Sequence, residues 1–368
     1  MAIVYLNDIN KMQEALDTAS PGDVIELPRG TQTVTVAPQK TRARKDMFAY
    51  FIIRVENLTI RGQGYRTKIQ LKHNPTDCSI DAPCLFYVKH SANHKGAHNC
   101  RFENMYLRGE CRQRFKPYES EHWRHGSAIY SYHCDGTTCY RIWTKNWQNH
   151  IEMEWGKYLT IRDCTAMGVN VCSAWRFNRA EDFVAVNLKG RPYTSGEWNP
   201  GINRPQYPSV GFSMGLWITP GCKGGLIENL VMSDCKNEAL IIEGLGISDI
   251  RVNNCDLSNS TWGFASRGMD NSLLTDMRIS DCWRCGIMLH SLNDLQGEMT
   301  GNTFLNNTVH NCGNQREDGF NNWSSIFEGK KTANNTFKDN IVTFDDPGPW
   351  PAPGKLVNLK SHDNNEGT

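Results

Sequence analysis

The sequence predicts a single-domain, all-β protein folded as a parallel β-helix, in which the chain winds as a solenoid. Two observations predict this class. A seven-residue pattern with apolar side chains at alternate positions recurs along the 368 residues, and a second alternating run follows it about ten residues later. A period of two is typical of strands, and a repeat of this length indicates strands that stack in parallel from coil to coil.

The seven-residue pattern ends in a small or polar residue, most often cysteine. Its copies superimpose without gaps at residues 57–63, 105–111, 158–164, 229–235, 249–255, 276–282 and 306–312. The spacing of the terminal cysteines indicates a repeat unit of roughly 20–30 residues. Free cysteine behaves as a small buried apolar residue, so we expect one file of cysteines inside the coil, made of Cys164, Cys235, Cys255 and Cys282.

The second run occurs at residues 150–155, 239–243, 263–267 and 286–290. Asn, Gly and Asp separate the runs, and Asn suits such turns because it tolerates the left-handed conformation. We therefore expect two or three short strands in each coil. The Leu and Asn spacing of a leucine-rich repeat and the blades of about 40 residues of a propeller are not seen.

The N-terminus predicts a cap for the open end of the strand stack. Asn7 or Asp8 can cap a short helix, which a turn and a strand over 20–27 follow. Its apolar face is expected to consist of Ile9, Met12 and Leu16. Such a helix would cover backbone groups that otherwise stay unpaired.

The expected boundaries follow from these elements. Residues 1–30 form the cap, and residues 31–345 form the β-helix, with loop insertions at about 112–126 and 190–210. The Pro-rich segment 346–368 closes the chain.

The segment Asp17–Gly30, which follows the capping helix, is similar to the opening of pectin-lyase-like right-handed β-helix proteins. These include polysaccharide lyases related to alginate lyase and chondroitinase B, and the cores of phage tailspikes. The opening motif covers about thirty residues, and the coil pattern covers nearly everything after it. The resemblance implies a right-handed coil, and it reports the fold more specifically than the activity.

The amino-acid composition limits the kinds of binding partner and the cellular compartment that we expect for this protein. Lys and Arg number 40 against 39 Asp and Glu, so we expect no nucleic acid and no membrane as partner. Fourteen cysteines without a visible export signal favour reduced, buried thiols. The localisation is open: we expect either a virion-associated protein or a secreted one whose signal is absent from this sequence.

Outward side chains of one β-helix sheet form rows one coil apart, which brings distant residues together. If Ile151, Leu240, Phe264 and Ile287 point inward, one outward row is expected to read Glu154, Asn178, Thr219, Glu243, Arg267 and His290. Carboxylate, cation and imidazole on neighbouring coils would be within reach of a sugar chain. The predicted catalytic residues are Glu152, Glu154, Lys157, Arg176, Glu243, Arg267 and His290.

Two reactions are open for these groups. The lyases that the opening resembles hold calcium with a Glu-x-Glu strand and a nearby Asn, and then use a Lys base and an Arg. The resemblance implies Ca²⁺ at Glu152, Glu154 and Asn178, with Asn149 as an alternative ligand. It also implies Lys157 as base and Arg176 as cation, although Lys157 stands closer to the glutamates than in the family pattern.

A glycoside hydrolase would instead use paired carboxylates, for instance Glu154 with Glu243. The structural alternative is that these outward charges form a solvated face. Tryptophans near the proposed face are candidates for stacking against sugars. They are Trp143, Trp147, Trp155 and Trp217, together with Trp198 in the second loop insertion.

The function expected from the sequence is a polysaccharide-binding protein that cleaves an acidic glycan, as a lyase or a hydrolase. The alternative is a non-catalytic virion structural protein, such as a tailspike or a capsid-decorating subunit, expected to form a homotrimer with virion neighbours. A lyase or hydrolase predicts a groove above the glutamate pair. A structural protein predicts that the same face is covered by another subunit.

Overall fold

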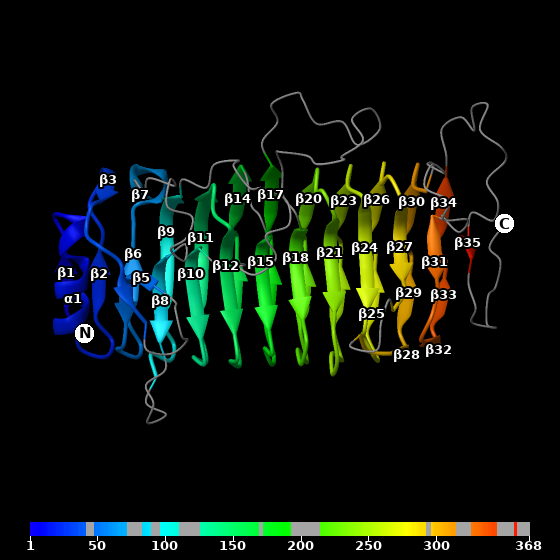
Figure 1. The fold of residues 1–368 in the computed structure, drawn as a ribbon, viewed down its shortest axis with the longest axis horizontal. Helices are drawn as coiled ribbons and strands as arrows, with labels where there is room; N and C mark the ends of the chain where they lie inside the picture. The colour runs from blue at the N-terminus through cyan, green and yellow to red at the C-terminus, as the bar shows by residue number, and fades with distance from the viewer. Residues whose placement is uncertain are drawn as a thin grey trace. The chain divides into compact units, whose positions relative to one another are not determined.

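A computed structural model describes residues 1–41, 48–71, 83–89, 96–109, 126–168, 172–192, 214–291, 296–313, 325–343 and 357–358. The chain divides into two compact units, residues 1–184 and residues 185–368. Parallel coils build both units (Figure 1). Most of the two expected loop insertions and of the closing segment lies outside the described residues.

The N-terminal cap is confirmed. Asp8 accepts a hydrogen bond from the backbone N–H of Asn10 and starts a 3₁₀ turn, η1 (Ile9–Lys11), which continues into α1 (Met12–Thr18). The predicted apolar face is buried. Gln13 of α1 donates to the carbonyl of Ile52 and accepts from its N–H at 2.9 Å, so the helix satisfies backbone groups of sheet B.

In each unit the coils form two sheets, which we call sheet A and sheet B. Sheet A contains two files of short strands, so each coil contributes two strands to it. In unit 1 the first file contains β1 (Ile3–Tyr5), β2 (Val24–Glu26), β6 (Thr59–Arg61), the first halves of β9 (Arg101–Arg108) and β11 (Thr138–Lys145), and β13 (Thr160–Arg162). The second file contains β3 (Gly30–Val34), β7 (Thr67–Leu71), the other halves of β9 and β11, and β14 (Thr165–Gly168). Before β7 lies the 3₁₀ turn η2 (Gly64–Arg66).

Sheet B of unit 1 contains β4 (Gln39–Lys40), β5 (Phe48–Ile53), β8 (Cys84–Lys89), β10 (Ser127–Tyr132), β12 (Asn149–Glu154) and β15 (Ser173–Asn178). β4 runs antiparallel to β5, and the other pairs are parallel. The helix α1 contacts β5. Strand β16 (Val184–Val186) begins at the last residue of unit 1.

Unit 2 repeats this arrangement. The first file of its sheet A contains β19 (Leu226–Glu228), β22 (Arg251–Asn253), β25 (Leu273–Thr275), β29 (Thr303–Leu305) and β33 (Thr336–Lys338). The second file contains β17 (Lys189–Pro192), β20 (Val231–Ser233), β23 (Asp256–Ser258), β26 (Arg278–Ser280), β30 (Thr308–His310) and β34 (Ile341–Thr343).

Sheet B of unit 2 contains β18 (Met214–Thr219), β21 (Glu238–Glu243), β24 (Trp262–Arg267), β27 (Cys285–Leu289), β31 (Ile326–Glu328) and β35 (Val357–Asn358). The short strands β28 (Met299–Thr300) and β32 (Thr332–Ala333) pair separately. Two described residues of the closing segment thus add a strand to sheet B.

In the described part of the chain, no helix has the length and apolar character needed to cross a bilayer.

Asn and Asp residues in the left-handed conformation end the short strands, as predicted. Asn229 and Asn254 follow the first-file strands β19 and β22 with φ of 55° and 50°, and Asp234 and Asn259 follow the second-file strands with φ of 57° and 49°. The side chain of Asn254 donates to that of Asn229 at 2.7 Å across one coil. The corner residues therefore turn the chain and also link successive coils.

The prediction of a single cysteine file is wrong, although all four of its cysteines are buried. Cys235 and Cys282 follow second-file strands, with Ser260 between them in the stack. Cys164 and Cys255 follow first-file strands of their units. Some copies of the seven-residue pattern contain a first-file strand, and others contain a second-file strand. Superimposing all copies therefore treated two different positions in the coil as one.

Hydrogen-bonded positions on successive coils of unit 2 are 22 to 33 residues apart, close to the predicted repeat of 20–30 residues. The twelve cysteines of the described part are free and buried. Burial raises the pKa of Cys164 and of Cys255 to about 12.

The inward register of sheet B is confirmed. Ile151, Leu240, Phe264 and Ile287 are each fully buried, and the last three lie opposite one another on β21, β24 and β27. The residues between them project from the other face of sheet B and carry the candidate site.

Candidate functional site

The predicted carboxylate pair lies on the outward face of sheet B in unit 1. Glu152 of β12 is opposite Arg176 of β15, and Glu154 is opposite Asn178. This face is not open to solvent at the pair, because Glu152 is fully buried and Glu154 is 2% exposed. Both carboxylates must therefore find partners within the protein.

Glu152 is the centre of a buried ion pair. Its Oε1 accepts from Nη1 of Arg176 at 3.0 Å, and its Oε2 accepts from Nδ2 of Asn149 at 3.1 Å and from Oγ of Ser127 at 3.3 Å. These donors come from three successive strands, β10, β12 and β15. A buried carboxylate with this set of partners locks neighbouring coils in register, and removal of one partner would leave a charge uncompensated.

Glu154 is bound from both sides along the stack. The hydroxyl of Tyr130 on β10 donates to Oε2, and Nδ2 of Asn178 on β15 donates to Oε1 at 2.9 Å. Tyr130 stacks on Tyr87 of the preceding coil, with ring centroids 5.5 Å apart. The carboxylate therefore belongs to a packed polar network.

These contacts do not fit the calcium site that the resemblance implied. A guanidinium occupies one oxygen of Glu152, and Asn178 presents its NH₂ group to Glu154, where a cation would need an oxygen. In the part of the chain that the structure describes, no three His, Cys, Asp or Glu side chains are grouped to hold a metal ion.

Among the described residues, the ion pair of Lys157 is with Glu181 and not with Glu152 or Glu154. Lys157 is in the turn after β12, 53% of its side chain is exposed, and its Nζ pairs with Glu181. The hydrogen bond to Glu181 raises the pKa of Lys157, which favours the protonated amine. A base must be unprotonated, so this environment does not support the predicted role of Lys157.

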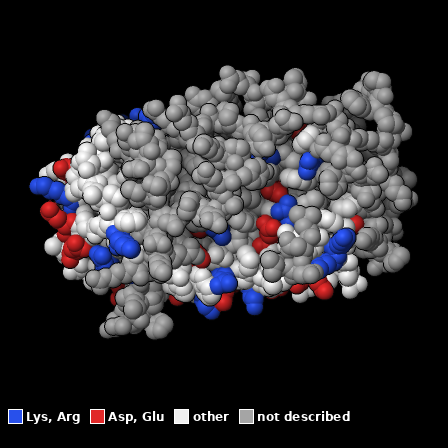
Figure 2. Space-filling model, in the orientation of Figure 1, with Lys and Arg blue, Asp and Glu red and all other residues white. Residues whose placement is uncertain are grey.

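A second cluster lies on the outward face of sheet B in unit 2. Arg267 of β24 donates to Glu238 at 2.7 Å and to Glu243 at 3.4 Å, and both glutamates belong to β21. Gln296 donates to the same Oε1 of Glu243 at 2.8 Å. Figure 2 shows acidic and basic side chains against one another in the region of β21 and β24.

The two carboxylates of this cluster differ in environment. Glu238 is 3% exposed, and burial raises its pKa even though Arg267 lowers it. The side chain of Glu243 is 25% exposed, and that of Arg267 is 13% exposed. Glu243 is therefore the carboxylate that a ligand can reach.

Ser266 of β24 is opposite Leu289 of β27. The residues that follow them, Arg267 and His290, are therefore neighbours in the same outward row. Its Nδ1 accepts from the backbone N–H of Lys330 at 3.2 Å, so the proton of the neutral ring is on Nε2. Gly329 lies against this ring, and a Cβ there would come within 2.1 Å of Nδ1. Glu243 and Arg267 end β21 and β24, and His290 is the residue after β27, so the three lie on successive coils in the predicted order.

The predicted tryptophans do not share one face. Trp143 belongs to β11 of sheet A, where it is half-buried. Trp147 is 3% exposed and donates its indole N–H to the carbonyl of Leu107, which makes it a core residue. Trp217 is half-buried on β18 of sheet B, opposite Ile241. Trp198 lies outside the described residues.

Trp155 is exposed but already stacked. It lies in the corner after β12, with the ring of His133 at 5.1 Å and the guanidinium of Arg179 at 4.0 Å from its centroid. These partners come from the preceding and the following coil, so both faces of the indole are covered. This arrangement leaves no free indole face for a sugar.

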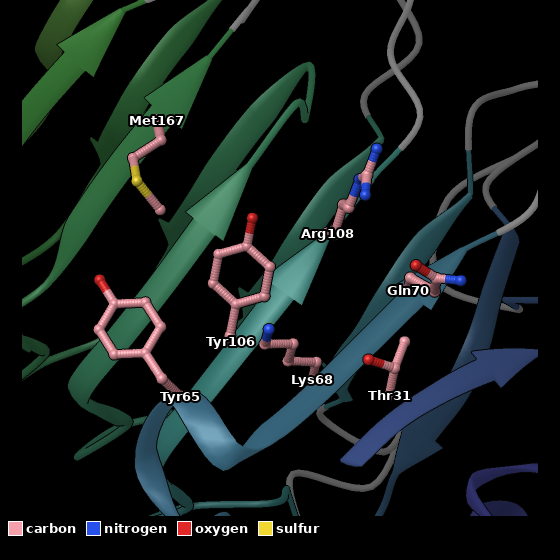
Figure 3. A pocket seen from close by; sticks show the side chains of 7 residues that line it. All are labelled: Thr31, Tyr65, Lys68, Gln70, Tyr106, Arg108 and Met167. Carbon is pink, nitrogen blue, oxygen red and sulfur yellow. The ribbon is translucent and has the colours of Figure 1, made fainter.

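A pocket of about 370 Å³ lies on the outward face of sheet A in unit 1. Figure 3 shows Tyr65 and Tyr106 next to each other, with Lys68 beside them and Arg108 and Gln70 further along the strands. The ring of Tyr65 also lies 4.3 Å from that of Trp143. Of these residues, only Trp143 was predicted from the sequence to bind sugar.

Sequence reasoning also missed several partners of the glutamates. Tyr130 had no clear signal, because residues 127–132 read Ser-Ala-Ile-Tyr-Ser-Tyr and do not alternate between apolar and polar. Glu238 was missed because it precedes the alternating run 239–243; it is the first residue of β21 and is opposite Trp262. Gln296 has no local signal, since it reaches Glu243 from 53 residues away.

Comparison with known proteins supports the architecture. Residues 212–352 match a family model described as a right-handed β-helix region. No curated protein sequence matches the chain.

Several solved structures share the fold. The A-module of a mannuronan C-5 epimerase from Azotobacter vinelandii is 14% identical, with a TM-score of 0.54 over 98% of this chain and 100% of the module. A mutant tailspike protein of the E. coli bacteriophage HK620, in complex with a pentasaccharide, is 14% identical, with a TM-score of 0.59 over 96% of this chain and 67% of the tailspike. A polygalacturonase from Erwinia carotovora is 10% identical, with a TM-score of 0.59 over 98% of this chain and 96% of the enzyme.

At these identities the likeness concerns the fold alone. The predicted right-handed parallel β-helix, and with it the resemblance to the pectin-lyase-like superfamily, is confirmed at that level.

Proposed function

We propose that the protein binds an acidic polysaccharide across the outward face of sheet B in unit 2 and cleaves it at the row Glu243, Arg267 and His290. One observation carries this proposal: a partly exposed carboxylate, held by two donors, is followed on the next two coils by a guanidinium and an imidazole. Polysaccharide-acting proteins among the solved neighbours support the same class of substrate.

Glu243 is the group best suited to accept a proton. Arg267 and Gln296 both donate to its Oε1, so Oε2 is the oxygen that can turn toward a ligand. A general base needs a fixed orientation and access to the substrate, and Glu243 combines the two. Glu238 has the first property but not the second, because it is buried.

His290 is suited to donate a hydrogen bond to the leaving oxygen. With Nδ1 bound to the N–H of Lys330, the neutral ring carries its proton on Nε2. Two strand spacings separate Glu243 from His290, about 9.6 Å between backbones, which leaves room for a glycosidic bond between the side chains.

The same pair serves either reaction. In elimination, Glu243 takes the proton beside the uronate carboxyl group and the C–O bond to the leaving sugar breaks. The leaving oxygen is stabilised by a hydrogen bond from Nε2–H of His290 and takes its proton from water, and the hydroxide left behind is neutralised when Glu243 releases its proton. In hydrolysis, Glu243 takes a proton from water as the water attacks the anomeric carbon, and the leaving oxygen, again hydrogen-bonded by His290, is protonated by solvent in the same way. Arg267 positions Glu243 in both cases.

The acidic nature of the substrate is supported by the names of two neighbours, which point to polymers of uronic acids. Incubation of the protein with polygalacturonate and with mannuronan tests the proposal. Ultraviolet absorbance detects unsaturated products, and new reducing ends detect both kinds of cleavage.

Glu243→Gln is expected to lower the rate by a factor of about 10²–10⁴, the usual contribution of a general base. Glu228→Gln is the matched control, because Glu228 accepts from Asn253 on sheet A of the same unit. Equal loss in both variants would contradict the assignment. A wild-type protein inert on all uronate polymers would leave the alternative prediction, a non-catalytic virion component.

A further inference from the structure

Two outward rows on sheet A of unit 1 form a surface that the proposed cleavage does not use. Successive strands pair Thr31 with Lys68, Lys68 with Tyr106, Tyr106 with Trp143, and Trp143 with Thr165. These five side chains therefore project side by side from the second file of strands.

The adjacent row, two residues further along each strand, consists of Thr33, Gln70, Arg108, Lys145 and Met167. Neither row contains an Asp or a Glu. This surface therefore carries three cations, which are Lys68, Arg108 and Lys145, and the aromatic rings of Tyr106 and Trp143. It also carries the hydroxyl and amide side chains of Thr31, Thr33 and Gln70. Tyr65, from η2, adds a third ring above it.

The aromatic side chains form one continuous group. Tyr65 is 51% exposed, and its ring centroid lies 4.3 Å from that of Trp143 and 6.0 Å from that of Tyr106, at tilts of 34° and 35°. Burial raises the pKa of Tyr106, so its hydroxyl stays protonated at neutral pH and can donate a hydrogen bond. Exposed rings of this kind offer apolar faces and polar edges together.

Two cations on this surface are exposed and lack a carboxylate partner among the described residues. Lys68 and Arg108 lie on adjacent strands and two positions apart, so their Cα atoms are about 8 Å from each other. Like charges this close repel unless an anion lies between them. The pocket of about 370 Å³ between these side chains has the size of a small ligand site (Figure 3).

We propose that this pocket binds an anionic oligosaccharide, with sugar rings on Tyr65 and Tyr106 and the acidic groups on Lys68 and Arg108. The proposal goes beyond the cleavage site, because the pocket lies on sheet A of unit 1 and its residues take no part in the reaction. Charge complementarity selects the anionic glycan, and the aromatic rings select a sugar over a simple ion.

A single-stranded nucleic acid is the other polymer that stacks on aromatic rings. Nucleic-acid sites track a phosphate backbone with many cations, and the whole chain carries 40 basic against 39 acidic residues. Two exposed cations beside a small pocket suit a short anionic sugar segment better.

The test measures binding of a galacturonate oligomer by calorimetry. All proteins carry Glu243→Gln, so that the oligomer is not consumed. Lys68→Gln with Arg108→Gln, and separately Tyr65→Ala, are each expected to weaken the pocket affinity about tenfold or more. Tyr65 is half exposed on a surface turn, so its replacement leaves the core intact.

The matched controls are Tyr5→Ala, at an exposed tyrosine of β1, and Arg162→Gln, at an exposed arginine of β13. They are expected to leave binding unchanged. Higher salt is expected to weaken binding in the parent protein and to matter less in the Lys68 and Arg108 double variant. A neutral glucose oligomer is expected to bind more weakly than the galacturonate oligomer.

Unchanged galacturonate binding in both pocket variants would overturn the proposal, and so would tighter binding of an oligothymidylate than of the galacturonate oligomer. The two proposals fail separately. If the wild type cleaves no polymer but the pocket variants lose binding, the cleavage site is wrong and the pocket stands. If cleavage depends on Glu243 while the pocket variants bind normally, the pocket is wrong.

Discussion

Replacement of Arg267 by methionine tests how the cluster of unit 2 is held together. Arg267 is the cation bound to both Glu238 and Glu243, at 2.7 and 3.4 Å, and its side chain is 13% exposed. Methionine retains most of the volume but leaves Glu238, 3% exposed, without a counter-charge. Loss of one partner of a buried ion pair costs about 3–5 kcal/mol. Because Arg267 is partly solvated, we expect about 3 kcal/mol at neutral pH.

The sign of the pH dependence follows from Glu238. Burial already raises its pKa in the wild type, and without Arg267 that pKa rises further. The folded variant then binds a proton that the unfolded chain does not, so its stability is highest below the unfolded pKa of a glutamate and falls as pH rises toward the folded pKa. The slope is at most about 1.4 kcal/mol for each pH unit.

The assay is urea unfolding followed by tryptophan fluorescence at several pH values. Arg251→Met is the control, because Arg251 is exposed on β22, and we expect a change within about 0.5 kcal/mol. Glu238→Gln in the Arg267→Met background is expected to remove the pH dependence. An Arg267→Met protein as stable as the wild type at neutral pH, or one that loses stability on acidification toward pH 5, would refute this account of the cluster.

Three further predictions concern other parts of the structure. Tyr130→Phe removes a donor from the buried Glu154 and is expected to cost about 1–3 kcal/mol in the free energy of unfolding, whereas Tyr158→Phe, at a tyrosine that is 65% exposed, is expected to change nothing measurable. Burial raises the pKa of Cys164 and Cys255 to about 12, so peptide mapping after alkylation at pH 8 should find both thiols unmodified in the native protein and modified in urea; rapid native labelling of either would contradict the buried files. Gly329→Ala would bring a Cβ within 2.1 Å of His290, so it is expected to lower cleavage more than Glu228→Gln does while the protein stays folded, and normal activity would argue against His290 as the hydrogen-bond donor to the leaving oxygen.

Strand periodicity made the coil predictable, because inward and outward positions alternate in every run. The rows of sheet B followed directly: Leu240, Phe264 and Ile287 are stacked inside, and Glu243 and Arg267 are neighbours outside. The assignment of strands to files was not predictable in the same way. Cys235 and Cys255 end segments with the same apolar pattern that contain two different strands, and only the pairing of β20 with β23 separates them.

The remaining differences between the sequence-based predictions and the structure come from burial and from partners that are distant in the sequence. Alternation places Glu152 and Glu154 outward, but whether an outward face is open depends on segments far away in the sequence. The tryptophan grouping was wrong because Trp143 lies on a sheet A strand, and sequence distance from β12 does not reveal the sheet. The sheet A pocket is lined by residues of four strands and one turn, none of which has a motif of its own.

The most direct test of the proposed function is an experimental structure of the Glu243→Gln protein with a bound galacturonate oligomer. We predict that a glycosidic oxygen lies between residue 243 and His290, with Nε2 of His290 within hydrogen-bonding distance of it. An oligomer that bypasses this row while the protein still cleaves the polymer would contradict the account.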